Sequence, residues 1–409
     1  MGGAVGHLMH LYDNRDLTFG EIGGILTAAS SGKLQQVSEK LDGMNLVFSW
    51  DVGSNSLKVV RSAGDIKRGG MNAEDLAAKF EGRGNLSDAF NSAYKVLNGA
   101  LGSLPDDAKL KVFGPNTNQW YSMEVIYTQT PNVINYDNNT IVFHGWPVFK
   151  VDDTGNVKMM KDDEGGVDVL TRYIERMQNA IEQRDWKIYG PMKARLEKLS
   201  DDSILNNALS AIDEELSSTG LDASATMRDY IEVKTRYDVE ALKVSPKIKE
   251  MMVKRCLAEP GAPSLVDIKK IANKSDHGII TDFIKNCPDR MKKHVRPIEL
   301  AINKFAVELL RGLKSTLIDD TGEEVQRLRA EVSKAIEAIK SSNNENAMSI
   351  LNSQMEKLKS LENITSPVEG VVFIYKGNAY KFTGSFAAAN QILGLFKYGR
   401  GGTKIQSLS

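Results

Sequence analysis

A lysine placed two residues before an Asp-Gly pair is the feature of this sequence best suited to chemistry. The segment reads Glu39-Lys40-Leu41-Asp42-Gly43-Met44-Asn45, and a strand-like run follows it directly. A lysine amine becomes a nucleophile when burial or nearby cations lower its pKa. An Asp-Gly turn would hold Lys40 at the rim of a sheet, where a phosphate can reach it. An ordinary turn preceded by a solvated lysine is the competing interpretation of the same four residues.

Further segments carry residue types that suit nucleotide chemistry, each in or beside a strand-like run. Arg61 follows a predicted hairpin in Val59-Val60-Arg61-Ser62, and Glu124 lies at a strand end in Met123-Glu124-Val125-Ile126. A Pro/Asn loop with an aromatic residue comes next, and the following β-rich run ends in Ile141-Val142-Phe143. Near the C-terminus the chain has Glu369-Gly370-Val371-Val372 and then Tyr380-Lys381-Phe382.

In this order, the segments resemble the motifs of the covalent nucleotidyltransferases, the superfamily of ATP-dependent DNA ligases, RNA ligases and mRNA capping enzymes. Lys40-Leu41-Asp42-Gly43 is similar to motif I, and residues 141–143, 369–372 and 380–382 are similar to motifs III, IV and V. The loop at 129–136, which ends in Tyr136, looks like that of RNA ligases. The resemblance covers roughly residues 37–145 and 366–400. It implies an ATP-dependent RNA ligase that joins 5′-phosphate and 3′-hydroxyl polynucleotide ends.

The resemblance also implies a role for each residue. Lys40 would attack the α-phosphate of ATP and hold AMP as a phosphoramidate, while Lys381, with Lys376 folded back across a turn, would neutralise phosphate oxygens. Glu369 would bind Mg²⁺ or Mn²⁺. An exposed ion pair between Glu369 and Lys381, worth well under about 1 kcal/mol, is the competing interpretation. The other nucleotide-binding residues would be Glu39, Asp42 and Gly43 of motif I, Arg61 on the phosphate, Glu124 on the ribose and Phe143 on the base.

Two departures from the family pattern bear on the choice of function. The segment resembling motif V carries one lysine, Lys381, where two separated by one residue are usual, and motif I continues with Met44-Asn45 in place of Ser or Arg. About 25 residues follow motif V, so we expect no OB-fold domain, which needs about five strands. This favours an RNA ligase over a DNA ligase or a capping-type nucleotidyltransferase. The single lysine keeps a non-catalytic nucleotide- or RNA-binding protein with a helical assembly module as another alternative.

The elements that must position these residues are strands at both ends of the chain and helices between them. Strand-like runs at 46–50, 57–60, 110–113, 120–126 and 140–144, with helical spacing over 72–101, predict a largely antiparallel sheet. Residues 165–362 read as almost continuous helix, and a hairpin at 368–383 follows. We therefore predict an α+β fold with an all-helical insertion at 165–362, and the resemblance implies that 1–164 and 363–409 form an ATP-grasp-like nucleotidyltransferase domain.

Composition limits the class of protein. The 409 residues include 52 Lys+Arg and 53 Asp+Glu, and 41% are hydrophobic, which is typical of a globular protein. No apolar run approaches the roughly 18 residues that a membrane span needs, and the N-terminus lacks a signal-peptide pattern. Cys256 and Cys287 are expected to be unpaired thiols in a reducing compartment. We expect a cytoplasmic protein that binds nucleic acid, RNA rather than DNA, and no membrane.

The helical block contains two groups of basic residues that would contact phosphates. A solvated helix face is an equally good interpretation, because Asp213-Glu214-Glu215 shows that the block has acidic faces too. The two groups are Lys247, Lys249, Lys254 and Arg255, and Lys285, Arg290, Lys292, Lys293, Arg296 and Lys304.

Overall fold

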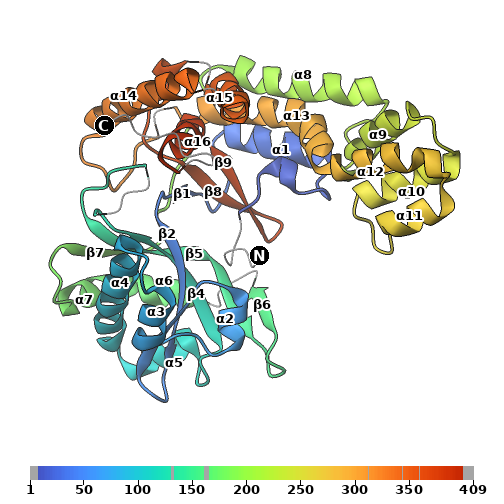
Figure 1. The fold of residues 1–409 in the computed structure, drawn as a ribbon. Coiled ribbons are helices and arrows are strands. Elements are labelled where there is room, and N and C mark those ends of the chain that lie inside the picture. The colour runs from blue at the N-terminus through green and yellow to red at the C-terminus, as the bar shows by residue number, and fades with distance from the viewer. Residues whose placement is uncertain are drawn as a thin grey trace. The chain divides into compact units, whose positions relative to one another are not determined.

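The computed structural model describes residues 8–129, 133–160, 165–311, 313–342, 344–358 and 360–398, and its fold is mixed α+β (Figure 1). The chain divides into two units. Unit 1 comprises Met1–Leu8, Gln35–Arg195 and Leu310–Ser409, and unit 2 comprises Met9–Leu34 and Leu196–Leu309.

These units differ from the predicted division into 1–164, 165–362 and 363–409. The N-terminal helix α1 (Phe19–Ser30) belongs to unit 2, whereas the helices after residue 309 belong to unit 1. Helical periodicity cannot place such boundaries, because it indicates that a segment is helical and not which core its apolar face joins.

Unit 1 contains a large sheet with the strand order β3-β2-β4-β5-β6, in which neighbours are antiparallel. A further strand pairs with β5 in the parallel direction. The predicted strands at 46–50, 57–60, 120–126 and 140–144 are confirmed. The strands are β2 (Met44–Asp51), β3 (Ser56–Val60), β4 (Gln119–Ile126), β5 (Asn139–Val151), β6 (Val157–Met160) and β7 (Trp186–Tyr189).

The prediction of a strand at 110–113 is wrong, because these residues form the end of helix α5 (Asp106–Phe113). The helix buries Ala108, Lys109, Val112 and Phe113, which have the spacing of one helix face. Lys109 donates from Nζ to the carbonyl oxygen of Gly102. Alternation over only four residues fits a strand and a helix equally well, so packing decided between them. The prediction that residues 165–362 are all helical is also wrong, because the strand β7 lies inside this block.

Helices cover one face of the large sheet (Figure 1). The core between them contains fully buried aromatic residues such as Phe48, Phe113 and Phe143, and each large apolar side chain contributes about 1.5–3 kcal/mol of burial free energy. On the opposite face, Ile66 of α2 (Ala63–Lys67) packs with Val47 and other apolar residues. Besides α5, the covering helices are α3 (Ala73–Phe80), α4 (Asn85–Gly102), α6 (Gly166–Arg172) and α7 (Ile174–Ala180).

A small antiparallel sheet joins the two ends of unit 1. Its order is β1-β8-β9, formed by β1 (Ser38–Lys40), β8 (Gly370–Tyr375) and β9 (Asn378–Thr383). The predicted C-terminal hairpin is thus confirmed. Three helices and the short η3 (Leu361–Asn363) complete the unit; the three are α14 (Thr321–Ser341), α15 (Glu345–Leu358) and α16 (Ser385–Tyr398), which share one apolar core.

Unit 2 is built from helices. Beside α1 these are η1 (Leu11–Asp13), α8 (Asp202–Thr219), α9 (Met227–Glu240), α10 (Pro246–Cys256), α11 (Leu265–Ile271), η2 (Lys274–Asp276), α12 (His277–Lys285) and α13 (Cys287–Leu309). Within the described ranges, no helix of either unit is long and apolar enough to cross a membrane.

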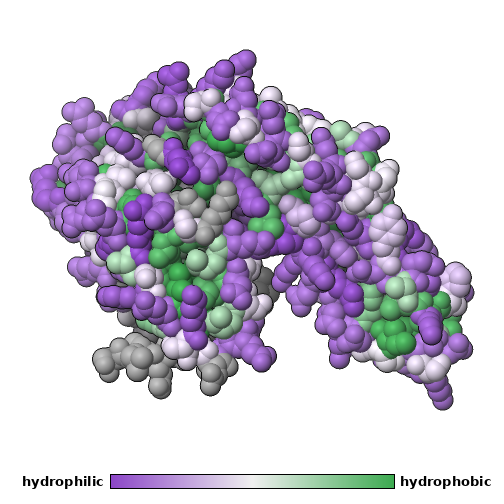
Figure 2. Space-filling model, turned by 90° about the horizontal axis from the view of Figure 1, so that it is seen from above, coloured by the Kyte–Doolittle hydropathy of each residue, from purple (hydrophilic) through white to green (hydrophobic). Residues whose placement is uncertain are grey.

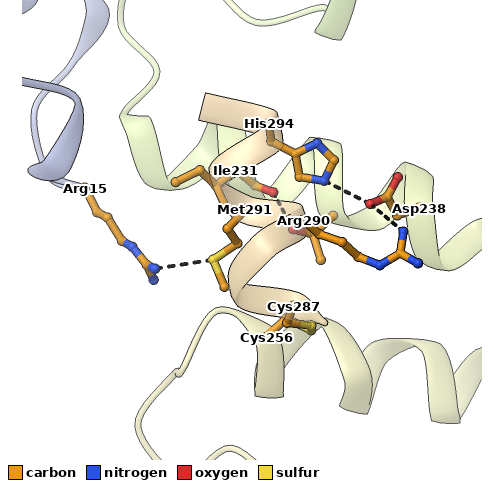
Figure 3. Close-up of a disulfide and its surroundings, with 9 residues drawn as sticks. Arg15, Ile231, Asp238, Cys256, Cys287, Arg290, Met291 and His294 are labelled. Carbon is orange, nitrogen blue, oxygen red and sulfur yellow. Dashed lines mark hydrogen bonds and ion pairs between the residues drawn. A yellow bond between two sulfur atoms is a disulfide. The ribbon is translucent and has the colours of Figure 1, made fainter. Parts of the chain in front are cut away.

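Cys256 and Cys287 form a disulfide between the end of α10 and the start of α13 (Figure 3). Their Cα atoms lie 5.6 Å apart. The prediction that both are unpaired thiols is therefore wrong. The sequence could not reveal the pairing, because only the packing of α10 near α13 brings the two cysteines together.

We expect Asp65 to make the stability of unit 1 depend on pH. Its Oδ2 accepts hydrogen bonds from Ser62 and from Lys79 Nζ, at 2.8 Å for the lysine. Burial raises the pKa of Asp65, but the hydrogen bonds from Lys79 and Ser62 outweigh it and lower the pKa from 3.8 to about 2. Because the folded-state pKa is depressed, the stabilisation is complete above pH 3.8 and is lost as the pH falls through 2.

We therefore expect denaturant titrations to show that Asp65→Asn lowers the free energy of unfolding at pH 7 by on the order of 2 kcal/mol. The difference from the wild type should shrink as the pH falls from about 4 to 2. Asp153→Asn, at an exposed loop residue, is the matched control and should leave the pH profile unchanged. An equal pH profile for wild type and Asp65→Asn would contradict the prediction.

Candidate functional site

Seven of the ten predicted site residues line one cavity of about 400 Å³ in unit 1. The cavity lies where segments from the small sheet and the large sheet meet. The seven residues are Glu39, Lys40, Asp42, Gly43, Glu124, Glu369 and Lys381.

The register of the small sheet places Lys40 beside Glu369. Lys40 of β1 lies opposite Gly370 of β8, so the residue before that glycine is its diagonal neighbour. The Lys40 Nζ and Glu369 Oε2 atoms are 2.5 Å apart, and the two side chains are only 19% and 14% exposed. Lys381 of β9 lies opposite Val372, which pairs in turn with Ser38. Since Ser38 and Lys40 are two residues apart, Lys381 and Lys40 share one face of this sheet.

Two glycines allow the backbones around the cavity to approach closely. A Cβ atom at Gly43 would lie 2.6 Å from Cγ of Glu124, and one at Gly370 would lie 2.0 Å from the carbonyl oxygen of Phe382. Neither position has room for a larger residue. Close packing alone therefore requires glycine after Asp42 and after Glu369, whether or not the cavity binds a nucleotide.

Asp42 holds the turn that connects the small sheet to the large one. Its Oδ2 accepts hydrogen bonds from the backbone N–H groups of Val133 and Ile134, at 2.9 and 3.1 Å. The Asp42 N–H donates to the hydroxyl of Tyr136 at 2.9 Å. This aromatic residue is the one that ends the loop after Glu124, so the structure brings that loop to motif I. Residues 130–132 of the loop lie outside the described part of the chain.

The charges in the cavity hold Lys40 as an ammonium ion. Burial by itself lowers the pKa of Lys40, but the carboxylate of Glu369, with smaller contributions from Glu124 and Asp42, raises it above its usual value. Burial raises the pKa of Glu369, against the opposing effect of Lys40. Because only the neutral amine is a nucleophile, attack by Lys40 requires that the negative charge of Glu369 be neutralised first.

Glu39 lines the cavity, but its carboxylate is bound to another segment of unit 1. Its Oε2 accepts hydrogen bonds from the N–H and the hydroxyl of Thr316, at 3.3 and 3.4 Å. Burial raises the pKa of Glu39. The side chain predicted to bind nucleotide thus also anchors the segment before α14.

The prediction that Phe143 contacts the base needs correction, because Phe143 does not line the cavity. It is 1% exposed and lies in the core beneath the helices, where its ring centroid is 5.1 Å from that of Phe48. Successive side chains of a strand point to opposite faces, so the next residue, His144, lines the cavity instead. The His144 ring lies 3.1 Å from Oε2 of Glu124.

Arg61 and Lys376 are also not among the lining residues of this cavity. Arg61 donates from Nη1 to the carbonyl oxygen of Asn45 and lies over the ring of Phe90 at 5.1 Å, so it supports the wall from behind. Lys376 is in the β8–β9 turn, exposed, with Nζ 5.5 Å from the Tyr375 ring centroid. The turn is the opposite end of the hairpin from Glu369, so Lys376 is not the missing partner of Lys381.

Several lining residues were not predicted, among them Asn45, Ser122, His144 and Trp146. Asn45 donates from Nδ2 to Ser122 Oγ at 2.7 Å. The period of two along a strand could have identified Ser122 from Glu124. Nothing in the sequence pattern indicated Trp146, whose Nε1 is buried and has no hydrogen-bond partner within the part of the chain that the structure describes.

The carboxylates around the cavity meet part of what Mg²⁺ requires of its ligands. Among the described residues, no group of three or more His, Cys, Asp and Glu side chains could hold a metal by itself. The cavity nevertheless is lined by four carboxylate residues, Glu39, Asp42, Glu124 and Glu369. Mg²⁺ is commonly bound by one or two carboxylates together with substrate phosphates. The residues therefore fit a cation shared with a phosphate ligand, and they do not form a closed protein site.

Compared with protein-family models, curated proteins and solved structures, the chain matches none of them.

Proposed function

We propose that this protein is an ATP-dependent RNA ligase that acts through a covalent Lys40–AMP intermediate, in a nucleotidyltransferase domain of ATP-grasp-like fold. The observation that carries the proposal is the contact of Lys40 with Glu369 in a cavity also lined by Lys381 and Glu124. Three sequence motifs, the first about 330 residues before the last two, converge there.

In the first step, the neutral Nζ of Lys40 attacks the α-phosphorus of ATP. The P–N bond forms, the bond from phosphorus to the pyrophosphate oxygen breaks, and the amine proton leaves. Mg²⁺ or Mn²⁺ held by Glu369 would supply positive charge to the phosphates. Lys381 places a second cation on the same sheet face as Lys40, where it would bind the α-phosphate oxygens. Neutralisation of Glu369 removes the main cause that keeps Lys40 protonated.

In the later steps, AMP passes from Lys40 to the 5′-phosphate of a polynucleotide, and a 3′-hydroxyl then attacks that phosphate and releases AMP. Each step exchanges one phosphorus bond for another and needs no further cofactor. The side chains of Asn45, Ser122 and His144 lie in the cavity wall contributed by the large sheet. They would contact the ribose and the phosphates together with Glu124.

Two observations favour a second candidate, a non-catalytic protein that binds nucleotide or RNA. Lys40 is held as an ammonium ion, and Lys376 lies away from the cavity. A lysine bound permanently to Glu369 would be a structural ion pair, since a buried pair of this kind needs both partners.

The test is to incubate the protein with Mg²⁺ and either α-labelled ATP or α-labelled GTP, and then to look for label that survives denaturation. Label from ATP is expected. Label from GTP alone would favour capping chemistry, and absence of label with either nucleotide would leave the non-catalytic candidate. Sealing assays with single-stranded RNA ends and with nicked DNA duplexes then separate an RNA ligase from a DNA ligase.

A further inference from the structure

The helical unit 2 separates its charges along the chain. Residues 197–242 contain 4 Lys and Arg against 11 Asp and Glu. Residues 243–293, which form α10, α11, η2, α12 and the first turns of α13, contain 12 Lys and Arg against 6 Asp and Glu. We call residues 243–293 the basic segment. The near-zero charge of the whole chain therefore hides a strongly positive region.

Three of the six acidic side chains of the basic segment form ion pairs. Glu250 pairs with Arg236 of α9 at 2.7 Å, and Asp289 pairs with Lys292 at 3.5 Å. Asp267 pairs with Lys270 and caps the start of α11. By contrast, seven basic side chains of the segment form no ion pair with any described residue: Lys243, Lys247, Arg255, Lys269, Lys274, Lys285 and Lys293.

The disulfide joins the two ends of the basic segment's helices α10 and α13. The disulfide holds the end of α10 and the start of α13 with their Cα atoms 5.6 Å apart. Arg255 and Lys285, both exposed, are one and two residues from its cysteines. A folded segment of this length has a radius of gyration of about 10 Å. The excess of six positive charges in a segment of this size would attract the phosphates of a nucleic acid backbone.

Exposed apolar groups beside these cations indicate a single strand and not a duplex. Tyr237 of α9 is 58% exposed, and ion pairs Arg236–Glu250 and Lys249–Glu240 fix that end of α9 against α10. Val266 and Ile271 of α11 are 62% and 52% exposed, and Figure 2 shows a hydrophobic area on the part of unit 2 that α9 to α12 form. Unpaired bases stack on exposed aromatic side chains, whereas bases in a duplex are not accessible for stacking.

We propose that the basic segment, with Tyr237, binds the single-stranded polynucleotide substrate. Lys and Arg contact its phosphates and the apolar side chains contact its bases. This inference rests on the proposed ligase function and assigns the polynucleotide a second contact region, separate from the Lys40 cavity.

The experiment uses the full chain and a fluorescent single-stranded RNA with a 5′-phosphate, and measures anisotropy over a range of salt concentrations. The variant Arg255→Gln, Lys285→Gln, Lys293→Gln should bind about tenfold or more weakly, and the slope of log affinity against log salt should fall by about 2, since each lost contact with a single strand removes about 0.7. Tyr237→Ala should weaken binding about fivefold or more.

The matched control removes three other exposed charges, through Lys95→Gln, Lys111→Gln and Lys334→Gln in helices of unit 1, and should bind RNA like the wild type. Equal weakening in the two triple variants would overturn the proposal, because binding would then follow net charge alone. Tighter binding of duplex than of single-stranded RNA would overturn it too. So would binding to vesicles of anionic lipid in place of RNA.

Labelling of Lys40 by ATP is measured on the same variants without RNA, so that the two proposals fail separately. If the wild-type protein takes label normally but does not bind RNA, this inference is overturned and the ligase chemistry stays intact. RNA binding that depends on the basic segment in a protein that takes no label supports the contact region and rejects the ligase.

Discussion

Replacing Lys40 by alanine is expected to abolish covalent labelling by ATP, on the order of a thousandfold or more, because the variant lacks the nitrogen that bonds to phosphorus. Among the lysines that the structure describes, Lys40 is the one whose Nζ forms an ion pair with Glu369 in the cavity. Lys40→Arg should be equally inactive, since a guanidinium stays protonated at all accessible pH values. The measurement is the amount of label that stays with the denatured protein per mole of enzyme.

The two substitutions should differ in stability, which separates lost chemistry from lost folding. Lys40→Ala leaves Glu369, which lies in a buried site, without its partner, and removing one member of such a pair costs about 3–5 kcal/mol. Lys40→Arg keeps a positive charge there and should unfold at a denaturant concentration close to that of the wild type. Label at the wild-type level in folded Lys40→Arg would reject Lys40 as the nucleophile.

Replacing Gly370 by alanine is expected to lower the free energy of unfolding by about 3 kcal/mol, the upper end for an overpacked site, and to abolish labelling as well. The added Cβ would lie 2.0 Å from the carbonyl oxygen of Phe382 and 3.0 Å from Cα of Thr383, both backbone atoms of β9. Backbone cannot move aside as a flexible side chain can, so β8 must shift. Because Gly370 pairs with Lys40 and follows Glu369, the shift separates the two charged groups.

Gly99→Ala is the matched control for this prediction. Gly99 lies inside α4, and nothing is within 4 Å of where its Cβ would be. Alanine is favoured over glycine inside a helix by about 0.5–1 kcal/mol, so this variant should be slightly more stable than the wild type. Denaturant titration measures both variants. Gly370→Ala with wild-type stability and wild-type labelling would show that the close β8–β9 contact does not matter.

Local patterns were enough to predict many of the elements. The runs at 46–50 and 120–126 are strands because β-branched and aromatic residues follow each other there, and the Lys376-Gly377 turn marks the C-terminal hairpin. Local patterns failed where packing chose between two structures. Residues 110–113 are helical because α5 buries Val112 and Phe113 against the large sheet.

For the site residues too, local patterns predicted the secondary structure, whereas packing decided which side chains reach the cavity. Phe143 was predicted correctly to lie on a strand, but strand periodicity does not say which face meets the cavity, and His144 occupies that face. Arg61 and Lys376 were predicted from the resemblance to the nucleotidyltransferase motifs. Arg61 instead supports the cavity wall through Asn45, and Lys376 stays at the turn.

The sequence by itself determined which chemistry was available: a lysine before an Asp-Gly turn, a Glu-Gly pair before a strand, and the order in which they occur. The tertiary structure decided that they meet. Pairing of β1 with β8 places Lys40 against Glu369 across about 330 residues of chain, and helix packing likewise joins Cys256 to Cys287. The physical reason is that residue type and spacing act over a few positions, whereas contacts between distant segments depend on how whole faces bury their apolar surface.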